Sequence, residues 1–371
     1  TTEAGIEYKP EPYTPGKCQN TYPAKLASLL YERFKAFNGA ADKGLVLIPC
    51  ELIDKNGTNL KKCILNYAKD WNLPAEFTAW INESNLFVNT LVDRIVAGYP
   101  RAEAAKIEAE LGYNDNLIDC GEIFHFFVIE GPQSLSKELP LIDAGLQVVI
   151  TDNQTPYRTR KVRFLNGAHT ADVLAASLGG LTFVDEMMND PDFGRMVCKA
   201  INDEIFHTVQ LPEEEKRFFA DSVIERFKNP FAQHRLLSIS LNSVSKWKVR
   251  VMPSLLDYVQ MKGRLPEVLA FSLAALIRFY ILELKDGTAE GSVDGRTYPV
   301  ADSEDVLRFF ADATAQFKAD GNTAKLVASV LGNKEFWGMD LNTVPGLAEF
   351  ATAKLELIKK DGIRSAVKTI L

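Results

Sequence analysis

The sequence is poor in the features that mark several large classes of protein. Its five cysteines are odd in number and none stands in a Cys-x-x-Cys pair, so they indicate neither a disulfide framework nor a zinc site. No stretch approaches the roughly 18 uninterrupted apolar residues of a membrane helix. The first residues do not resemble a signal peptide. We therefore expect a protein of the reducing cytoplasm that binds no metal and no membrane.

An excess of positive charge is also missing. The 371 residues contain 42 Lys and Arg against 49 Asp and Glu, which gives a formal net charge of −7. Nucleic-acid binding depends on Lys and Arg that neutralise phosphates, so the sequence predicts no nucleic-acid partner. Hydrophobic residues make up 46% of the chain, enough for an ordinary globular core. A small molecule is the expected partner, and the sequence leaves the oligomeric state open.

Residues 1–150 alternate between strand and helix patterns. The apolar run at 44–49, bounded by Gly and Pro, is typical of a buried parallel strand. Further β-like segments lie at 86–96, 123–129 and 148–150, and helical patterns at 24–37, 60–68, 75–82 and 101–111. This alternation favours an α/β fold with a parallel sheet.

From residue 151 the helical patterns take over and strand signals nearly vanish. We predict helices at about 156–178, 192–207, 213–228, 252–261, 265–284, 302–316, 322–331 and 345–370. The Gly-rich segment 286–298 is expected to be a loop, and the region around 234–246 a polar interval between helices. The predicted architecture is an incomplete α/β portion at 1–150 followed by an all-helical domain at 151–371.

The most informative segment for chemistry contains Lys161, Asn166 and His169. On an α-helix, Asn166 lies about 140° and His169 about 80° around the axis from Lys161, so all three can border one pocket. A desolvated lysine can act as acid or base, an amide can stabilise an alkoxide-like oxygen, and a histidine can orient substrate or lysine. The alternative is a solvated lysine, a capping asparagine and a core histidine.

The Lys-x4-Asn-x2-His pattern at the start of a long helix resembles the signature of the mannitol dehydrogenase family of polyol-specific long-chain dehydrogenases. Details of the chain are most similar to the branch that acts on uronates, including residues 1–6 and 37–44. Further landmarks occur in family order: Pro49-Cys50-Glu51 with Asn56-Gly57, Val92-Asp93-Arg94-Ile95, and Phe124-His125 with Val128-Ile129-Glu130.

The resemblance implies a fold and a set of roles. The α/β portion would be the C-terminal part of a Rossmann-like dinucleotide-binding domain, and NAD would be the cofactor in the reduction of a ketouronate to its aldonate. Lys161 would be the general acid/base, Asn166 an oxyanion donor and His169 a partner of the substrate or the lysine. Asp93 would line the substrate site, although a structural salt bridge with Arg94 or another cation is the alternative.

The chain departs from the family pattern at Leu52, where mannitol-type relatives have a second oxyanion donor, Asn. Either another residue supplies that hydrogen bond, with Asn56 close by, or the uronate branch manages with one donor. A uronate also carries a carboxylate, which favours Arg or Lys partners. His234, Arg235 and Lys246 in the polar interval are the candidates, and a solvated loop is the alternative.

A strand followed by a Gly-rich pyrophosphate turn is not found in the sequence. By resemblance, Thr1, Thr2 and Glu3 would follow a central strand near the nicotinamide, and the strands before them would be missing. We therefore expect these 371 residues alone to bind NAD weakly or not at all, and the choice between NAD and NADP stays open.

Other functions compete with this interpretation. Mannitol, fructuronate or another polyol could be the substrate. The chain could also be a non-catalytic helical binding module, or an aldolase or epimerase whose lysine forms a Schiff base.

Overall fold

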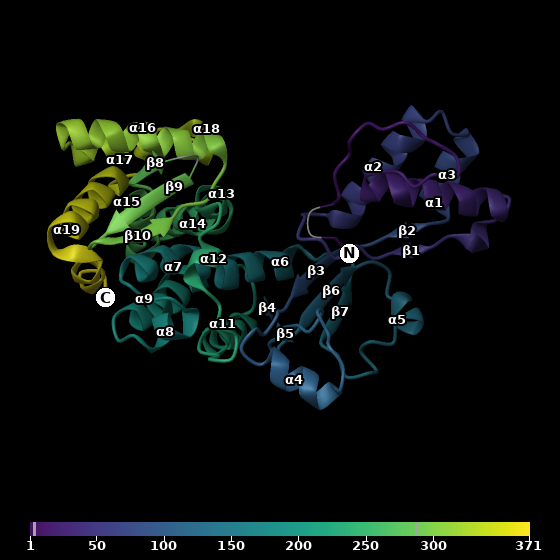
Figure 1. Ribbon diagram of the computed structural model, residues 1–371, viewed down its shortest axis with the longest axis horizontal. Coiled ribbons are helices and arrows are strands. Elements are labelled where there is room, and N and C mark those ends of the chain that lie inside the picture. Colours follow the sequence, from purple (N-terminus) through teal and green to yellow (C-terminus); the bar gives the residue numbers. More distant parts are fainter. Residues whose placement is uncertain (3–4, 286–287) are drawn as a thin grey trace. The chain divides into compact units, whose positions relative to one another are not determined.

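The computed structural model describes residues 1–2, 5–285 and 288–371, which form two compact units (Figure 1). The first contains Thr1–Arg94 and Ile123–Arg158, and the second contains Ile95–Glu122 and Thr159–Leu371. The excursion Ile95–Glu122, which carries strand β4 (Val96–Gly98), helix α4 (Ala104–Leu111) and strand β5 (Cys120–Gly121), is grouped with the helical residues that follow much later in the chain.

The first unit places helices over short strands. Figure 1 shows helices α1, α2 and α3 on one side of the β1–β2 pair. Large apolar side chains of these helices, such as Leu30, Ile64 and Phe77, are buried together with Tyr67 and form the core of this part. The elements of the unit are α1 (Tyr22–Ala36), η1 (Ala41–Lys43), β1 (Val46–Leu47), α2 (Asn56–Asp70), α3 (Ala75–Glu83), β2 (Leu86–Phe87), β3 (Asn89–Asp93), β6 (Phe126–Glu130), α5 (Leu135–Glu138) and β7 (Val148–Thr151).

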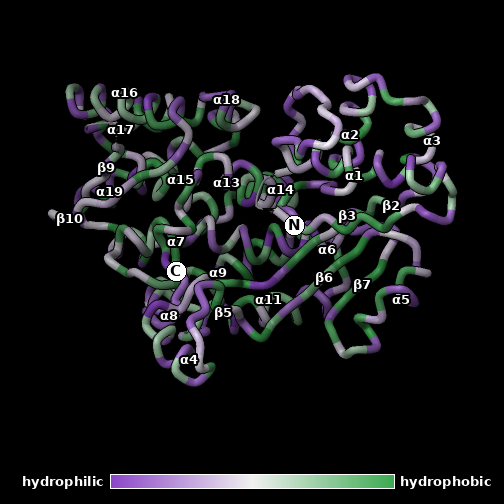
Figure 2. The backbone as a smooth tube through the Cα atoms, turned by 45° about the vertical axis from the view of Figure 1, so that its right-hand side comes forward, coloured by the Kyte–Doolittle hydropathy of each residue, from purple (hydrophilic) through white to green (hydrophobic). Residues whose placement is uncertain are grey.

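Parallel pairing, which the sequence predicts, is present in two strand pairs. Val46 and Leu47 of β1 pair with Leu86 and Phe87 of β2, and β6 runs parallel to β7. Both β6 and β7 are hydrophobic over most of their length (Figure 2), as expected for strands covered on both faces. Strand β3 pairs antiparallel with β6, so this sheet is mixed.

The second unit is built around helix α15 (Glu267–Phe279), which is buried at every residue from Val268 to Ile277. A helix that is apolar all round belongs in the middle of a core. It packs against α7 (Ala168–Leu178) and α19 (Leu347–Lys368). The remaining helical segments are α6 (Thr155–Lys161), which begins in the first unit, η2 (Val162–Gly167), α8 (Val184–Asn189), α9 (Phe193–Lys199), η3 (Ala200–Ile205), α10 (Phe206–Thr208), α11 (Glu213–Phe227), α12 (Leu236–Ile239), α13 (Ser243–Arg250), α14 (Met252–Lys262), α16 (Glu304–Asp320), α17 (Thr323–Leu331), α18 (Lys334–Trp337) and η4 (Leu341–Thr343).

The predicted loop at 286–298 is wrong for residues 288–298, and residues 286–287 lie outside the described part of the chain. Strands β8 (Leu282–Lys285), β9 (Thr288–Val293) and β10 (Arg296–Pro299) form an antiparallel three-stranded sheet in the order β10-β9-β8. Every second residue of β9 is buried, but two of these are Ala289 and Gly291, whose small side chains give almost no apolar signal. The alternation that marks a strand is therefore present in the structure and faint in the sequence.

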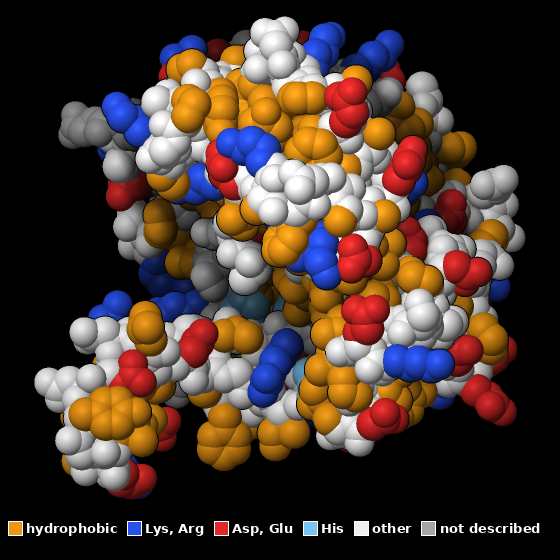
Figure 3. Space-filling view, turned by 90° about the vertical axis from the view of Figure 1, so that its right-hand side faces the viewer, with side chains coloured by type: hydrophobic (Ala, Val, Ile, Leu, Met, Phe, Trp, Pro, Cys, Tyr) orange, Lys and Arg blue, Asp and Glu red, His pale blue; other side chains and the backbone are white. Residues whose placement is uncertain are grey.

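The surface carries both signs of charge. On the face seen in Figure 3, Lys and Arg are interspersed with Asp and Glu, and hydrophobic side chains lie between them. Among the described residues, no helix is long and apolar enough to cross a membrane.

Two acidic side chains lie deep in the helical core. Glu204, in the π-helical segment η3, accepts hydrogen bonds from the backbone N–H groups of Val268 (2.8 Å) and Leu269 (2.9 Å) at the start of α15. Burial nevertheless raises the pKa of Glu204 to about 7. Asp172 on α7 is fully buried, and neither carboxyl oxygen has a hydrogen-bond partner among the described residues. Burial, with the nearby charge of Glu204, raises the pKa of Asp172 well above its usual range.

Glu204 should make stability depend on pH. Below its ordinary pKa of 4.5 both folded and unfolded chains hold the proton, whereas between 4.5 and about 7 only the unfolded chain ionises. The free energy of unfolding should therefore fall with rising pH across this window, by about 3 kcal/mol from this group, and level off above it. Urea denaturation at a series of pH values measures this slope. Glu204→Gln should reduce the slope without abolishing it, because the pKa of Asp172 is also raised by burial, whereas Glu214→Gln, an exposed change on α11, should leave the slope as it is; an unchanged slope in Glu204→Gln would refute the assignment.

Candidate active site

Lys161, Asn166 and His169 lie on one continuous helical run that changes pitch in the middle. Lys161 ends α6, residues Val162–Gly167 form the π-helical segment η2, and His169 stands in the first turn of α7. A π-helix bonds residue i to residue i+5, so Asn166 comes closer to the azimuth of Lys161 than the 140° expected for an unbroken α-helix. The wider turn therefore improves on the predicted convergence of these residues, and π-bulges are frequent at functional sites.

Gly167 explains how another helix comes close to this segment. A Cβ atom at Gly167 would lie 3.0 Å from the carbonyl oxygen of Arg250, the last residue of α13, and 3.4 Å from that of Val162. The missing side chain thus allows the end of α13 to pack directly against the π-helical turn. A Cβ atom at this position would make the Arg250 carbonyl shift by a few tenths of an ångström.

The three side chains differ in their burial. Lys161 is 9% exposed and His169 6% exposed, whereas Asn166 is half-buried. The amide of Asn166 forms no hydrogen bond with any residue that the structure describes, so its donor remains available for a ligand. A buried amine followed by an accessible amide is suited to proton transfer at a substrate oxygen.

His169 is held by stacking rather than by hydrogen bonds. Its ring lies flat on Phe227, with centroids 3.9 Å apart, and edge-on to His234 at 5.5 Å. Its Nε2 atom has no partner among the described residues. Burial lowers the pKa of His169 well below its ordinary value, helped by the positive fields of His234, Arg226, Arg250 and Lys246. His169 is therefore a neutral imidazole at physiological pH, able to donate or accept a hydrogen bond but not to carry charge.

The region around 234–246, predicted to be a polar loop, contains helices α12 and α13. His234 precedes α12 and contacts His169, and burial lowers its pKa from the ordinary value. Lys246 lies on α13, half-buried, and donates a hydrogen bond to the Ile239 carbonyl oxygen (2.9 Å). Both remain candidates for substrate binding. In the described part of the chain, no cluster of three His, Cys, Asp or Glu side chains could hold a metal ion.

Arg235 lies in a different place from His234 and Lys246. Its guanidinium lies over the ring of Phe183, 5.2 Å from the centroid, and it lines a cavity of about 190 Å³ together with Arg296. That cavity also includes Gly180, beyond the C-terminal end of α7, whereas His169 stands in the first turn of α7 and lines a different cavity. The structure therefore gives no support for a role of Arg235 beside His169.

A buried ion pair that the sequence analysis missed lies beside His169. Arg226 of α11 pairs with Glu122 at 2.8 Å, and both side chains are at most 5% exposed. The same carboxylate accepts a hydrogen bond from the Ile95 backbone N–H (2.6 Å). Arg226 and Ile95 line one small cavity with His169 and His234. The two partners are 104 positions apart, so no local pattern could have revealed the pair.

The predicted residues of the first unit are placed as follows. Asp93 ends strand β3 and is 1% exposed, with Phe126 as its partner across the sheet. Thr1 is exposed, whereas Thr2 donates hydrogen bonds from its N–H (2.7 Å) and hydroxyl (2.9 Å) to the Glu51 carboxylate. Glu3 lies outside the described residues. The second oxygen of Glu51 is buried and unpaired among the described residues, so it could accept a ligand's hydrogen bond.

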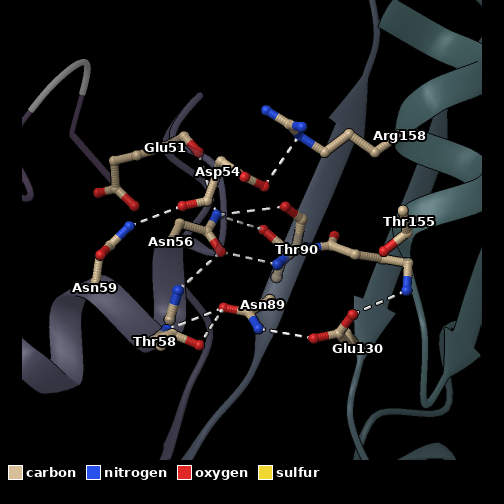
Figure 4. Close-up of polar contacts among 12 residues, drawn as sticks. Glu51, Asp54, Asn56, Thr58, Asn59, Asn89, Thr90, Glu130, Thr155 and Arg158 are labelled. Carbon is tan, nitrogen blue, oxygen red and sulfur yellow. Dashed lines mark hydrogen bonds and ion pairs between the residues drawn. The ribbon is translucent and has the colours of Figure 1, made fainter.

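Asn56 is not free to replace the oxyanion donor missing at Leu52. Its side chain is fully buried and its Nδ2 donates to the Pro49 carbonyl oxygen (2.9 Å) and the Thr90 hydroxyl (3.0 Å). Its Oδ1 accepts from the backbone N–H groups of Gly57 and Thr90, both at 2.9 Å (Figure 4). All of its hydrogen-bonding capacity ties α2 to β3 and to the loop after β1, and Leu52 itself is 75% exposed.

Both parts of the chain match known protein families. Residues 1–143 match the family model described as the mannitol dehydrogenase Rossmann domain, and residues 153–359 match the mannitol dehydrogenase C-terminal domain. An altronate oxidoreductase of Yersinia pestis is 48% identical over 368 residues, which cover 99% of this chain and 74% of that protein. One from Enterobacter sp. (strain 638) is 48% identical over 371 residues, covering 100% of this chain and 75% of that protein.

Two solved structures share the fold at 22% identity. One is Pseudomonas fluorescens mannitol 2-dehydrogenase in a ternary complex with NAD and D-mannitol, with a TM-score of 0.71. The other is D-sorbitol dehydrogenase in substrate-free form, with a TM-score of 0.72. Each match covers 94% of this chain, which spans 66% of the length of either solved chain.

The network of Asn56 predicts a stability effect rather than a catalytic one. Asn56→Ala should remove the acceptor of the buried Thr90 N–H and one of the two donors to the Pro49 carbonyl oxygen, and lower the free energy of unfolding by about 2 to 4 kcal/mol. Chemical denaturation measures this loss, and Asn59→Ala, which removes an amide that donates to the Asp54 carbonyl oxygen at the surface, is the control. Full stability with a large fall in kcat would instead identify Asn56 as an oxyanion donor.

Proposed function

The chain belongs to the mannitol dehydrogenase family, and on this premise we propose that it interconverts D-tagaturonate and D-altronate as an NAD-dependent oxidoreductase with Lys161 as general acid/base. The observation that carries the chemistry is the buried Lys161 at the start of a π-helical turn, followed on the same helix by Asn166 and the neutral His169. The names of relatives about 48% identical over nearly the whole chain support the substrate.

The residues of the first unit are compatible with part of a dinucleotide site. In an open α/β sheet the ligand lies beyond the carboxyl ends of the strands. Glu51 follows the carboxyl end of β1, and its unpaired buried oxygen could accept a hydrogen bond from a hydroxyl or amide group of NAD. Thr2 orients that carboxylate. The 371 residues contain no Gly-x-Gly-x-x-Gly turn, so the groups that hold the pyrophosphate are not identified among them.

Lys161 would move the proton. A bound NAD would supply the hydride acceptor for oxidation of the alcohol carbon of altronate, and NADH the hydride donor for reduction of the ketone of tagaturonate. In the oxidation, a neutral Lys161 amine accepts the hydroxyl proton of the reacting carbon. In the reduction, the protonated amine donates it to the alkoxide oxygen, so that a carbonyl becomes an alcohol without free hydroxide or acid.

Asn166 and His169 would act on the same oxygen and its neighbours. The unpaired amide of Asn166 can donate a hydrogen bond to the oxygen as negative charge develops on it. His169, kept neutral by burial and by nearby cations, can hydrogen-bond a substrate hydroxyl through its unpaired Nε2 without competing for the transferred proton. Their fixed positions on one helix would keep the substrate oxygen beside Lys161.

A lysine substitution tests the proposal. In the full-length protein, NADH oxidation with tagaturonate should be faster than with fructuronate or fructose. Lys161→Ala should lower kcat/KM by about 10² to 10⁴-fold, the usual contribution of general acid/base catalysis. Lys360→Ala, an exposed change on α19, is the control. Equal rates for Lys161→Ala and wild type would refute the mechanism, and trapping of substrate on Lys161 by borohydride would favour a Schiff-base enzyme instead.

A further inference from the structure

Helix α13 presents two cations on one face. Lys246 and Arg250 are four residues apart, so their side chains are neighbours on the helix surface. The adjacent face is anchored in the core by Trp247, which is fully buried and donates a hydrogen bond to the Ser272 hydroxyl of α15 (2.9 Å). The orientation of the helix, and with it the position of both cations, is therefore fixed by the core.

Both cations are partly removed from water. Burial, and then the charge of Arg250, lowers the pKa of Lys246 to about 8. Burial also lowers the pKa of Arg250 from its ordinary value. Like charges four residues apart destabilise a helix, and desolvation of unpaired cations costs further free energy. An arrangement that is unfavourable for folding suggests a role in binding.

Acidic side chains offset these charges only in part. Neither Lys246 nor Arg250 forms an ion pair with an acidic residue in the described part of the chain. The acid that faces Lys246 is Asp302, and its carboxylate already accepts hydrogen bonds from the Tyr280 hydroxyl (2.6 Å) and the Ser303 N–H (2.8 Å). The Lys246 amine uses one of its three N–H groups on the Ile239 carbonyl oxygen. Donors and charge are thus left over for an anion.

The cationic face lies beside the proposed reaction site. The carbonyl of Arg250 packs against Gly167 in the π-helical turn, one residue after Asn166. The charges of Arg250 and Lys246 also contribute, after burial, His234 and Arg226, to the lowered pKa of His169. Within the same cluster, the Nδ1 atom of His234 has no partner among the described residues.

The other charged groups around His169 and His234 do not neutralise the positive charge of Lys246 and Arg250. Arg226 is neutralised by Glu122. His169 and His234 line a small cavity, and Asp185 is the one acidic residue among the described residues that line it. It forms no ion pair with either cation of α13 among the described residues.

We propose that Arg250 and Lys246 together bind the substrate's carboxylate. Through this contact, Arg250 selects an acidic sugar over a neutral polyol. The proposal rests on the proposed function, because it assigns the carboxylate end of the same substrate whose reacting carbon lies at Lys161. A guanidinium can hold a carboxylate with two parallel N–H···O bonds, and the Lys246 amine adds a third donor. A neutral polyol would leave both cations desolvated and unpaired, which a polar site strongly disfavours.

Binding of matched ligands tests the proposal without relying on turnover. D-Altronate and D-altritol differ only at one terminal carbon, which is a carboxylate in the first and a hydroxymethyl group in the second. Calorimetry with the full-length protein and NADH, with which neither alcohol can react, should show tighter binding of altronate than of altritol by wild type. Arg250→Gln should weaken altronate binding by about 10² to 10³-fold and altritol binding far less. Lys248→Gln removes the same charge from the same helix, but its amine lies near Gly338, so the preference should persist.

The outcomes separate this proposal from the proposed function. If wild type reduces tagaturonate and Arg250→Gln keeps the preference for altronate, the carboxylate site is elsewhere and the inference is wrong. If wild type does not reduce tagaturonate, the proposed function fails. A binding preference for altronate that disappears in Arg250→Gln would then still support the anion site, and the lack of any preference would overturn it. Circular dichroism checks that each variant is folded, and recovery of affinity in Arg250→Lys would support a charge-based role.

Discussion

The close approach of two helices at Gly167 is the constraint on which the proposed site depends. Because Gly167 has no side chain, the end of α13 packs against the π-helical turn that separates Lys161 from His169. One side of this contact carries the groups suited to proton transfer, and the other carries two cations. Trp247 and the buried helix α15 hold α13 in place. On our proposal, the core of the helical unit would thus fix the distance between the reacting oxygen and the acidic end of the same substrate.

Burial determines the charge of each group around this contact. It keeps His169 neutral, leaves Lys246 and Arg250 poorly solvated, and is tolerated at Arg226 because Glu122 pairs with it. Elsewhere in the same core it favours a proton on Asp172 and raises the pKa of Glu204 to about 7. Desolvation of a cation is unfavourable unless an anion is present. An anionic substrate bound at α13 would pair with Lys246 and Arg250, so its binding would offset the unfavourable desolvation of these cations.

The sequence predicted the features that depend on short-range patterns. The spacing of Lys161, Asn166 and His169 and the long helix that carries them could be read directly, and so could the helices and parallel strand pairs of the first unit. It did not predict the π-helical turn, which no short-range pattern marks. Strand β9 was missed because two of its three buried positions are Ala and Gly, and β8 and β10 because each has a single buried residue, Leu282 or Tyr298. The sequence also could not predict contacts between residues far apart in the chain. Asn56 bonds with Thr90, 34 positions away, and Arg250 lies against Gly167 of another helical segment.

A crystal structure of the full-length protein with NAD and D-altronate would test the account most directly. The account predicts the reacting hydroxyl oxygen within hydrogen-bonding distance of the Lys161 amine, about 2.6 to 3.2 Å, and the carboxylate at the guanidinium of Arg250. Asn166 should donate to the same hydroxyl oxygen. A carboxylate bound at Arg235, or a reacting carbon remote from Lys161, would contradict it.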